Sequence, residues 1–298
     1  MEYGAHLPLI DLDGRGWSAP GLASYARTVE RLGYRTLAAN DHLTFVRPWL
    51  DGLVAMASVI GASGDVELAT TVALPAVRGP AALAKAAAAI DVLSGGRLVL
   101  GLGPGSSRAD HELAGLDFDQ RWAQFDDAVG VVRRHLGREL GGTPLEPGPV
   151  RPGGPPVWIA SWGSPAGLRR VARLGDGWLA SAYNTTPDDV ARGRARIAEL
   201  AIRPLTCAVA TMWTWVTDDD RDRRAVLARL ATLLGRAEHD LAARLMVGSP
   251  EHCAELASAY AGVGVDRLLV WPVADHHGQL ERFMQDVVPR VVRPATAR

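Results

Sequence analysis

The sequence predicts an α/β fold, a single (β/α)8 TIM barrel that spans residues 1–298. Short apolar runs alternate eight times with longer segments of helical periodicity, and eight alternations favour a closed barrel over an open sheet. Some of the short runs, such as 98–102, are apolar on both faces, as buried parallel strands are. The chain has 298 residues, of which 48% are hydrophobic, and this suffices for one barrel with a large core.

Eight strands are expected from the apolar runs, at residues 3–7, 36–39, 66–72, 98–102, 157–161, 177–181, 205–215 and 266–271. A helix follows each strand. Ser18 is a suitable N-cap for the first helix, and Gly33 can end it. The second helix is expected over 48–62, the third begins at Pro80, and the last lies near 280–292.

Two segments depart from this alternation. Residues 138–156 are rich in proline and glycine, which is typical of a surface loop. Residues 233–250 form extra material before the last strand, and a short helix is expected there. We interpret the first segment as a loop of the barrel and not as a linker, so the whole chain is predicted to be one domain.

Composition excludes several classes of protein. The formal net charge is −1 and there is no basic stripe, so nucleic acid is not an expected partner. No apolar stretch reaches the roughly 18 residues of a membrane span, and the first residues lack the features of a signal peptide. Cys207 and Cys253 are far apart, which indicates reduced thiols in a cytoplasmic protein. Lys85, the only lysine, lies in a helical segment, which argues against Schiff-base catalysis.

In a β/α barrel, reactive side chains lie on the loops after the C-terminal ends of the strands. His42 follows the second strand and is the first candidate for acid–base catalysis, because imidazole titrates near neutral pH. His6, at the end of the first strand, is the second candidate. Asp41 is interpreted as an orienting partner or loop cap. An alternative stays open, in which Asp41 and His42 only cap the loop.

Glycine-containing segments suggest where a cofactor could lie. The glycine run 101–105 does not match the dinucleotide motif, because Ser106 takes the place of the third glycine. We interpret it as a tight exit from the fourth strand, past which a flat ring can approach. After the fifth strand, Gly163 and Ser164 precede a helix whose free N–H groups could bind a phosphate. Four tryptophans near strand ends could line an aromatic cofactor, although core packing is the more common role: Trp162, Trp213, Trp215 and Trp271.

These segments together resemble the bacterial luciferase-like superfamily, which includes flavin-dependent monooxygenases and enzymes that use a deazaflavin coenzyme. The most specific part is Ile-Asp-Val-Leu-Ser-Gly-Gly-Arg-Leu-Val-Leu-Gly-Leu-Gly-Pro-Gly at 90–105. It is preceded by Arg78-Gly-Pro through Lys85 and followed by Glu112, Gly115, Arg121 and Asp126. Asp41-His42-Leu43, the segment 156–160 and the segment 175–178 are similar to the family's second, fifth and sixth strand regions.

The resemblance implies that a cofactor, coenzyme F420 (a 5-deazaflavin) or FMN, lies at the mouth of the barrel. Its phosphate is expected near Gly163, Ser164 and Ser181. Its ring is expected over a bulge at Thr71 and Val72, near Gly103 and His42, with Asp41 also on the cofactor side. In the family the third strand ends in a non-proline cis peptide bond, and the alignment puts this bond between Thr71 and Val72.

Two departures from the family's glucose-6-phosphate dehydrogenase branch limit what the resemblance implies. Val46 stands where that branch has a tryptophan, and Ser106 stands where it has a glutamate. The sugar-phosphate substrate and the acid–base pairing of that branch are therefore not carried over to this chain.

The expected reaction is hydride transfer between a flavin or deazaflavin and a small organic substrate, with His42 as proton donor or acceptor. With FMN, oxygen activation would make the protein a monooxygenase. The arginine-rich composition with a single lysine tilts the prediction toward the deazaflavin. The expected partners are the small substrate, a separate reductase that supplies reduced cofactor, and a second copy of the chain in a homodimer.

Two alternatives remain at this point. One is a metal-dependent barrel hydrolase or isomerase, whose ligands would come from His6, Asp41, His42, His276 and His277; the favoured interpretation includes no metal. The other is a flavin-binding barrel without turnover, for which Ser106 is the only indication.

Overall fold

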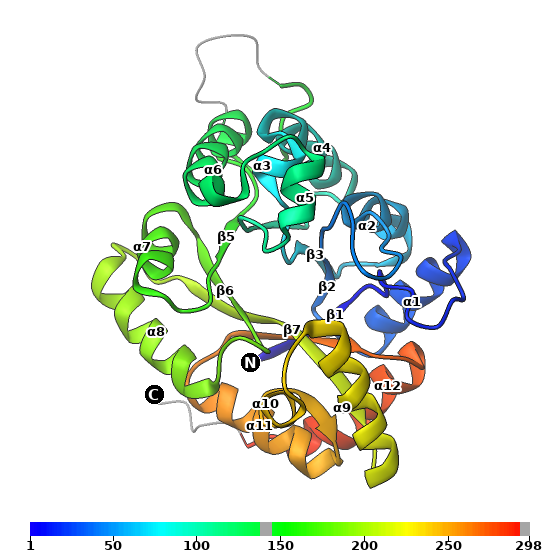
Figure 1. Cartoon of the computed structure of the whole chain (residues 1–298). Coiled ribbons are helices and arrows are strands. Elements are labelled where there is room, and N and C mark those ends of the chain that lie inside the picture. Colours follow the sequence, from blue (N-terminus) through cyan, green and yellow to red (C-terminus); the bar gives the residue numbers. More distant parts are fainter. Residues whose placement is uncertain (138–144, 293–298) are drawn as a thin grey trace.

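The computed structural model describes residues 1–137 and 145–292, and it contains the closed parallel barrel that the sequence predicts. Eight strands pair in the order β1-β2-β3-β4-β5-β6-β7-β9 and back to β1. They are β1 (Glu2–His6), β2 (Thr36–Ala39), β3 (Glu67–Thr70), β4 (Leu98–Leu102), β5 (Val157–Ala160), β6 (Gly177–Ser181), β7 (Thr206–Val216) and β9 (Arg267–Pro272). Figure 1 shows the helices arranged around these strands. All eight predicted strands are present, although β3 ends two residues earlier than expected.

A ninth strand, β8 (Met246–Gly248), lies outside the ring and pairs with the last three residues of β7. It occupies part of the 233–250 segment, for which only a short helix was predicted. That helix is present as α10 (Glu238–Ala242), but the prediction missed β8. Three residues are too few to show the alternation that identifies a strand in sequence, so only the pairing with β7 reveals it.

The helices that connect the strands are α1 (Ala19–Arg31), α2 (Gly52–Val59), α4 (Pro80–Leu93), α6 (Arg121–Gly137), α7 (Pro165–Leu174), α8 (Pro187–Leu200), α9 (Asp220–Leu234), α11 (Pro250–Gly262) and α12 (His276–Arg282). Two short ones, α3 (Pro75–Arg78) and α5 (Arg108–Leu113), lie in the loops after β3 and β4. Ser18 caps α1 as predicted, because its side chain accepts from the Gly21 amide. Among the described residues, no helix has both the length and the hydropathy needed to cross a bilayer.

The second helix begins later than predicted. Residues 48–50 are extended, because Trp49 forms an antiparallel bridge with Ile10 of the β1–α1 loop. The Asp51 side chain then accepts from the Val54 amide and starts α2. Of the predicted loop at 138–156, residues 138–144 lie outside the described residues, and 145–156 contain no helix or strand, as expected.

Two apolar layers stabilise the barrel. Side chains that point outward from the strands pack under the helices; Tyr3, for example, meets Phe283 edge-on at 5.3 Å. Side chains that point inward fill the barrel: Ala38, Ala69, Val99, Trp158, Leu179, Ala208, Ala210 and Leu269. Seven of these eight are alanine, valine or leucine, and the eighth is Trp158. The inner core is closed, so a ligand can reach only the ends of the barrel.

The C-terminal ends of the strands share one end of the barrel, because all the strands are parallel. The segment between β7 and β9 that contains α9 and α10 covers one side of this end of the barrel. Arg229 of α9 donates to the Leu12 carbonyl and the Asp13 carboxylate of the β1–α1 loop, and Arg236 donates to Asn184 after β6. The loops after β2 to β5 lie outside this cover. The peptide bond between Thr71 and Val72 is cis, as the resemblance implied.

Candidate functional site

A polar network lies across the C-terminal end of the barrel and includes three of the predicted site residues: His6, Thr71 and Ser181. The Thr211 amide donates to His6 Nε2 at 3.2 Å, and Thr71 Oγ1 lies 3.5 Å from His6 Nδ1. Thr71 also donates to Asn40 Oδ1 at 3.2 Å. At the other side, the hydroxyls of Ser181 and Thr211 are 3.0 Å apart. The ends of β1, β3 and β6 and the irregular middle of β7 are thus joined by side chains above the apolar core.

The environment of His6 keeps its ring neutral. His6 is buried, and burial lowers the pKa of the imidazole to about 3, against a hydrogen bond with Asn40 that acts in the other direction. Because Nε2 accepts from a backbone amide, the proton of the neutral ring lies on Nδ1. A ring held in this way is an unsuitable proton carrier near pH 7.

Thr211 is a member of this network that the sequence did not suggest. It lies at an irregularity in β7, where the pairing register with β9 shifts between Val209 and Met212. Its φ of 56° is in the left-handed region, which a β-branched residue adopts only when its surroundings enforce it. The His6 contact to the Thr211 amide and the Ser181 contact to its hydroxyl supply that constraint. A threonine inside an apolar strand carries no sequence signal for this conformation.

His42, which is partly exposed, pairs with the buried carboxylate of Asp110 on α5. Asp110 Oδ2 lies 2.7 Å from His42 Nδ1, and Oδ1 accepts from the amides of Leu43 and Thr44 at 3.1 and 2.9 Å. The carboxylate therefore holds both the ring and the loop after β2. With Nδ1 bound to Asp110, the proton of the neutral ring lies on Nδ1, and Nε2 makes no hydrogen bond to any residue in the described part of the chain. This arrangement leaves Nε2 free to exchange a proton with a substrate.

Electrostatics keeps Asp110 ionised. Burial alone would raise the pKa of the Asp110 carboxyl, but the hydrogen bonds from His42, Thr44 and Leu43 outweigh burial and hold this pKa below its usual range. Sequence reasoning missed Asp110. It follows the helix cap Ser107, and an acid in the first turn of a helix is ordinarily a partner of the helix dipole. Its contact with His42, 68 residues away, exists only in the fold.

Aromatic rings surround the other sides of His42. The Trp49 ring lies 4.6 Å from the His42 ring and the Phe45 ring lies 5.2 Å from it. Trp49 also meets Trp271 edge-on, and Trp271 stacks on His6 at 4.6 Å. The two predicted catalytic histidines are therefore joined by an aromatic array, and His42 lies at its more exposed end.

Asp41 precedes His42 in the loop after β2, and its carboxylate is bound by Arg78. Arg78 Nε and Nη2 donate to the two Asp41 oxygens at 2.6 Å each, and the Leu74 amide donates to Oδ2 at 3.2 Å. Arg78 also pairs with Asp51, the cap of α2, at 2.5 Å. The Asp41 side chain therefore ties the loops after β2 and β3 together, whereas the partner of the His42 ring is Asp110. A cofactor contact of Asp41 stays a prediction.

Val72 and Gly103 lie against each other, as the predicted ring position requires. A Cβ on Gly103 would lie 2.7 Å from Val72 Cγ2, and a Cβ on Gly101 would lie 2.0 Å from the Thr70 carbonyl oxygen. Both glycines are thus needed for the close packing of β4 against the end of β3. This accounts for the glycine run without a ligand, and a cofactor contact of Gly103 stays a prediction.

The predicted phosphate position is the N-terminus of α7. Ser164 caps this helix by accepting from the Gly167 amide, and the Gly163 amide donates to Ser161 Oγ at 3.2 Å. Pro165 has no N–H, so the amides of Ser164 and Ala166 are the donors left without partners among the described residues. Gly163 has a φ of +86°, and a Cβ there would meet nothing within 4 Å. Two outward amides and open space beside them suit an anion.

The chemistry of this end of the barrel fits a flavin or deazaflavin. Trp49 Nε1 is buried and has no acceptor among the described residues, whereas the ring system of such a cofactor carries carbonyl oxygens and ring nitrogens that accept hydrogen bonds. Stacked aromatic side chains line one side of the mouth, and the open amides of α7 offer a place for phosphate on the other. Of the other tryptophans considered, Trp213 stacks on Trp271, Trp215 is bound to Asp222 of α9, and Trp162 is exposed.

The residues of the metal-dependent alternative do not come together. His276 and His277 lie at the start of α12, where both rings meet Tyr25 edge-on and His277 contacts Thr28. Within residues 1–137 and 145–292, no three histidine, cysteine, aspartate or glutamate side chains gather in a way that could hold a metal ion.

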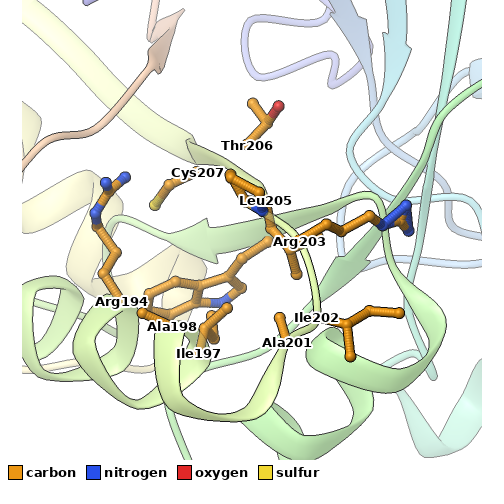
Figure 2. A pocket seen from close by; sticks show the side chains of 11 residues that line it. Arg194, Ile197, Ala198, Ala201, Ile202, Arg203, Leu205, Thr206 and Cys207 are labelled. Atoms are coloured by element: carbon orange, nitrogen blue, oxygen red, sulfur yellow. The ribbon is translucent and has the colours of Figure 1, made fainter.

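A hollow of about 390 Å³ lies at the opposite end of the barrel, between α8 and the start of β7 (Figure 2). Its two arginines are already bound: Arg194 donates to the Gly264 carbonyl, and Arg203 pairs with Asp176 at 2.5 Å. The thiol at its base, Cys207, is buried, and burial raises its pKa to about 12. Among its described lining residues this hollow therefore offers neither a free arginine nor a reactive thiol, and the candidate histidines His6 and His42 lie at the other end of the barrel.

The sequence of the chain is similar to that of known proteins. Residues 14–235 match the profile of the luciferase-like monooxygenase family. The chain is 29% identical over 233 residues to an F420-dependent hydroxymycolic acid dehydrogenase of Mycobacterium tuberculosis, covering 68% of this chain and 61% of that protein. It is 23% identical over 321 residues to an F420-dependent glucose-6-phosphate dehydrogenase of Amycolatopsis mediterranei, covering 91% and 94% of the two chains. The chain spans under two thirds of the first relative and nearly all of the second.

Solved structures share the fold. A monooxygenase from Streptomyces bottropensis superposes with a TM-score of 0.83 at 19% identity, over 97% of this chain and 99% of that chain. An F420-dependent secondary alcohol dehydrogenase bound to an F420–acetone adduct superposes with a TM-score of 0.82 at 16% identity, over 98% and 99%. At these identities the likeness establishes the barrel and leaves the reaction to be inferred from the site.

Proposed function

The chain belongs to the luciferase-like monooxygenase family, and on that premise we propose that it is an oxidoreductase that transfers a hydride between coenzyme F420 and a small organic substrate. FMN is the second candidate for the cofactor. The F420 dependence of curated relatives supports this order, as does the composition. The observation that carries the proposal is the Asp110–His42 pair at the mouth of the barrel.

The Asp110–His42 pair can accept or donate one proton. The cofactor, when bound, would accept or donate the hydride. In the oxidative direction His42 Nε2 takes the proton of the substrate hydroxyl; in the reductive direction it returns a proton to the carbonyl oxygen. Asp110 stays ionised throughout, holds the ring in one tautomer and stabilises the charged imidazolium. Phe45 and Trp49 keep bulk water from the inner side of the ring.

His6 has a different part in this proposal. Its neutral ring fixes the Thr211 amide and stacks on Trp271, so it shapes the floor on which the cofactor ring would rest. We assign the phosphate of the cofactor to the amides of Ser164 and Ala166 beside Gly163, with the Ser181 hydroxyl near by. Asp41 contributes by holding Arg78 and the loop that carries Thr71 and Val72.

Titration of the purified protein with F420 and with FMN, followed by absorption and fluorescence, tests the choice of cofactor. We expect saturable binding of F420, and of FMN more weakly, and reduction of bound F420 by an alcohol substrate. Binding of neither cofactor would refute the proposed function. Tight binding of FMN alone, with oxygen consumption, would replace the hydride transfer by monooxygenation.

Gly163→Ala tests the phosphate position. The positive φ at this residue costs an alanine about 1–2 kcal/mol, so the variant needs a matched control. Gly33→Ala is suitable, because Gly33 has a φ of +80°, open space around its Cβ position, and a place after α1, far from α7 along the chain. We expect similar losses in the free energy of unfolding for both variants, but a rise in the cofactor dissociation constant of about tenfold or more only for Gly163→Ala. Equal effects of both on cofactor binding would move the phosphate elsewhere.

Three finer expectations also belong to this proposal: a cytoplasmic location, a homodimer, and, if the cofactor is FMN, a separate reductase that delivers it in reduced form. The two buried, unpaired cysteines agree with a reducing compartment. Light scattering of the purified protein measures the oligomeric state directly.

A further inference from the structure

The two sides of the barrel mouth differ in polarity. Large apolar side chains are exposed on the loops and short helices after β2, β4 and β5: Leu43 (43% exposed), Val46 (77%), Leu113 (67%) and Trp162 (56%). The side after β6 and β7 carries polar contacts, such as those of Ser181 with Asn184 and of Arg236 with Asn184. Leu43 and Val46 lie on the loop that carries His42, and exposed apolar side chains beside a candidate catalytic residue suit a surface that binds a ligand.

His42 belongs to the apolar side. Leu43 follows it directly and Val46 lies on the same loop, and the rings in contact with His42 are Phe45 and Trp49. The one charged side chain in contact with the imidazole is Asp110, which is buried and whose two oxygens already take part in three hydrogen bonds. A substrate whose reacting carbon lies within reach of Nε2 therefore touches hydrocarbon and aromatic surface.

The arginines on this side are committed to other groups. Arg78 is bound by Asp41 and Asp51, Arg108 pairs with Asp119 and lies over the Phe118 ring, and Arg170 pairs with Asp126. Arg47 lies on the same loop as Val46, but it is exposed, and water leaves an exposed ion pair little net energy. A phosphate or carboxylate on the substrate would therefore find no buried free cation beside His42 among the described residues.

We propose that the apolar side of the mouth binds the hydrocarbon part of the substrate. The substrate is then an uncharged alcohol or carbonyl compound with an extended apolar group next to the reacting carbon, and not a sugar phosphate. This inference rests on the proposed function and names its substrate class. In the oxidation, the carbinol C–H bond breaks and its electron pair passes as hydride to the cofactor. The O–H proton passes to His42, and the C=O bond forms.

A chain-length series tests the substrate class. The protein loaded with F420 is assayed with 2-alkanols from three to eight carbons and with glucose 6-phosphate. We expect kcat/KM to rise about two- to fourfold with each added methylene group until the surface is covered, because each buried CH2 contributes about 0.8 kcal/mol at most. Glucose 6-phosphate should be at least about 100-fold poorer than the best alcohol. A flat series or a preference for the phosphate would overturn the proposal.

Variants of Leu43 and Val46, which we call rim variants, test whether the apolar side of the mouth causes the rise of kcat/KM with chain length. Leu43→Ser combined with Val46→Ser should flatten the chain-length dependence to less than twofold per methylene, with each alcohol compared with 2-propanol in the same variant. Ile202→Ser is the matched control, since Ile202 is fully exposed at the opposite end of the barrel and should leave the series unchanged. If the control flattens the series as much as the rim variant does, the apolar side is not the binding surface.

A direct binding measurement separates failure of this inference from failure of the proposed function. If F420 binds but no alcohol is oxidised, calorimetric titration of the loaded protein with 2-alkanones of four to ten carbons still decides the substrate class. Dissociation constants that fall with chain length in the native protein but not in the rim variant would support the apolar surface even though hydride transfer had failed. Constants independent of chain length would reject it.

Discussion

His6 and His42 follow neighbouring strands at the same end of the barrel, yet the structure gives them opposite environments. His6 is 1% exposed, its Nε2 is occupied by a backbone amide, and burial lowers its pKa to about 3. The His42 side chain is 19% exposed, its Nδ1 is held by an ionised carboxylate, and its Nε2 is free of protein contacts in the described part of the chain. A place at the C-terminal end of a strand is therefore not sufficient for acid–base chemistry. The partner of each ring nitrogen decides whether the histidine can carry a proton.

The comparison also shows how one site separates two tasks. A neutral, buried ring is rigid and holds backbone in an unusual conformation, as His6 does for Thr211. A partly exposed ring on an ionised acid can change its protonation during turnover, as proposed for His42. The experiments below test whether His6 stays neutral and whether His42 carries the proton.

The largest effect is expected for His42→Ala. Turnover should fall by about 100-fold or more, because a positioned proton carrier contributes roughly this much, while cofactor affinity stays within a few-fold. Added imidazole should restore part of the activity, since the His42 side chain is accessible to solvent. His6→Ala should show no imidazole rescue, because its site is closed. Unchanged turnover in His42→Ala, or rescue of His6→Ala, would reverse the assignment of the two histidines.

Asp110→Asn should lower turnover by about 10- to 100-fold without loss of cofactor affinity. The amide oxygen can keep the bonds from Leu43 and Thr44, which leaves the NH2 group facing His42 Nδ1. Nε2 would then carry the proton of the neutral ring, which is the wrong tautomer for proton acceptance. Nitrogen chemical shifts of His42 report this tautomer directly. Asp119→Asn, in an exposed pair with Arg108, is the control and should have little effect.

The smallest effect is expected in the pH dependence of stability. The pKa of His6 is about 3 in the folded protein and 6.5 in the unfolded chain, so the unfolded chain takes up the proton first as the pH falls. The free energy of unfolding should therefore be unaffected by His6 above pH 6.5. Below pH 6.5 it should decrease by up to about 1.4 kcal/mol per pH unit, about 2 kcal/mol by pH 5.

His6→Asn should remove this decrease of the free energy of unfolding below pH 6.5, although we expect the variant to be less stable than the native protein at pH 7. His42→Gln, the control for the loss of a histidine near by, should retain it. Denaturant unfolding at pH 7 and at pH 5 measures the difference. Equal slopes in the native protein and in His6→Asn would mean that His6 is protonated in the folded state, and the contrast between the two rings would disappear.

The sequence contained most of the information about the barrel. The eight apolar runs, the Ser18 cap and Pro80 at the start of α4 reflect burial, capping and backbone restrictions that act over a few residues, so they can be read locally. The errors occurred where local signals are weak: β8 has three residues, and residues 48–50 are extended because Trp49 pairs with Ile10 of a distant loop. The family resemblance added the cis bond between Thr71 and Val72, which no local pattern predicts.

The site was predicted less completely, for a physical reason. Sequence position predicted that His6, Asp41, His42 and Ser181 lie at the C-terminal end of the barrel, and they do, because the ends of parallel strands meet there. It could not show that Asp41 is bound by Arg78, or that Asp110 rather than Asp41 is the partner of His42. Ionisation, tautomer and exposure depend on atoms brought together from segments far apart in the chain. The sequence by itself determined which residues can do chemistry here, and the tertiary structure decided which of them are free to do it.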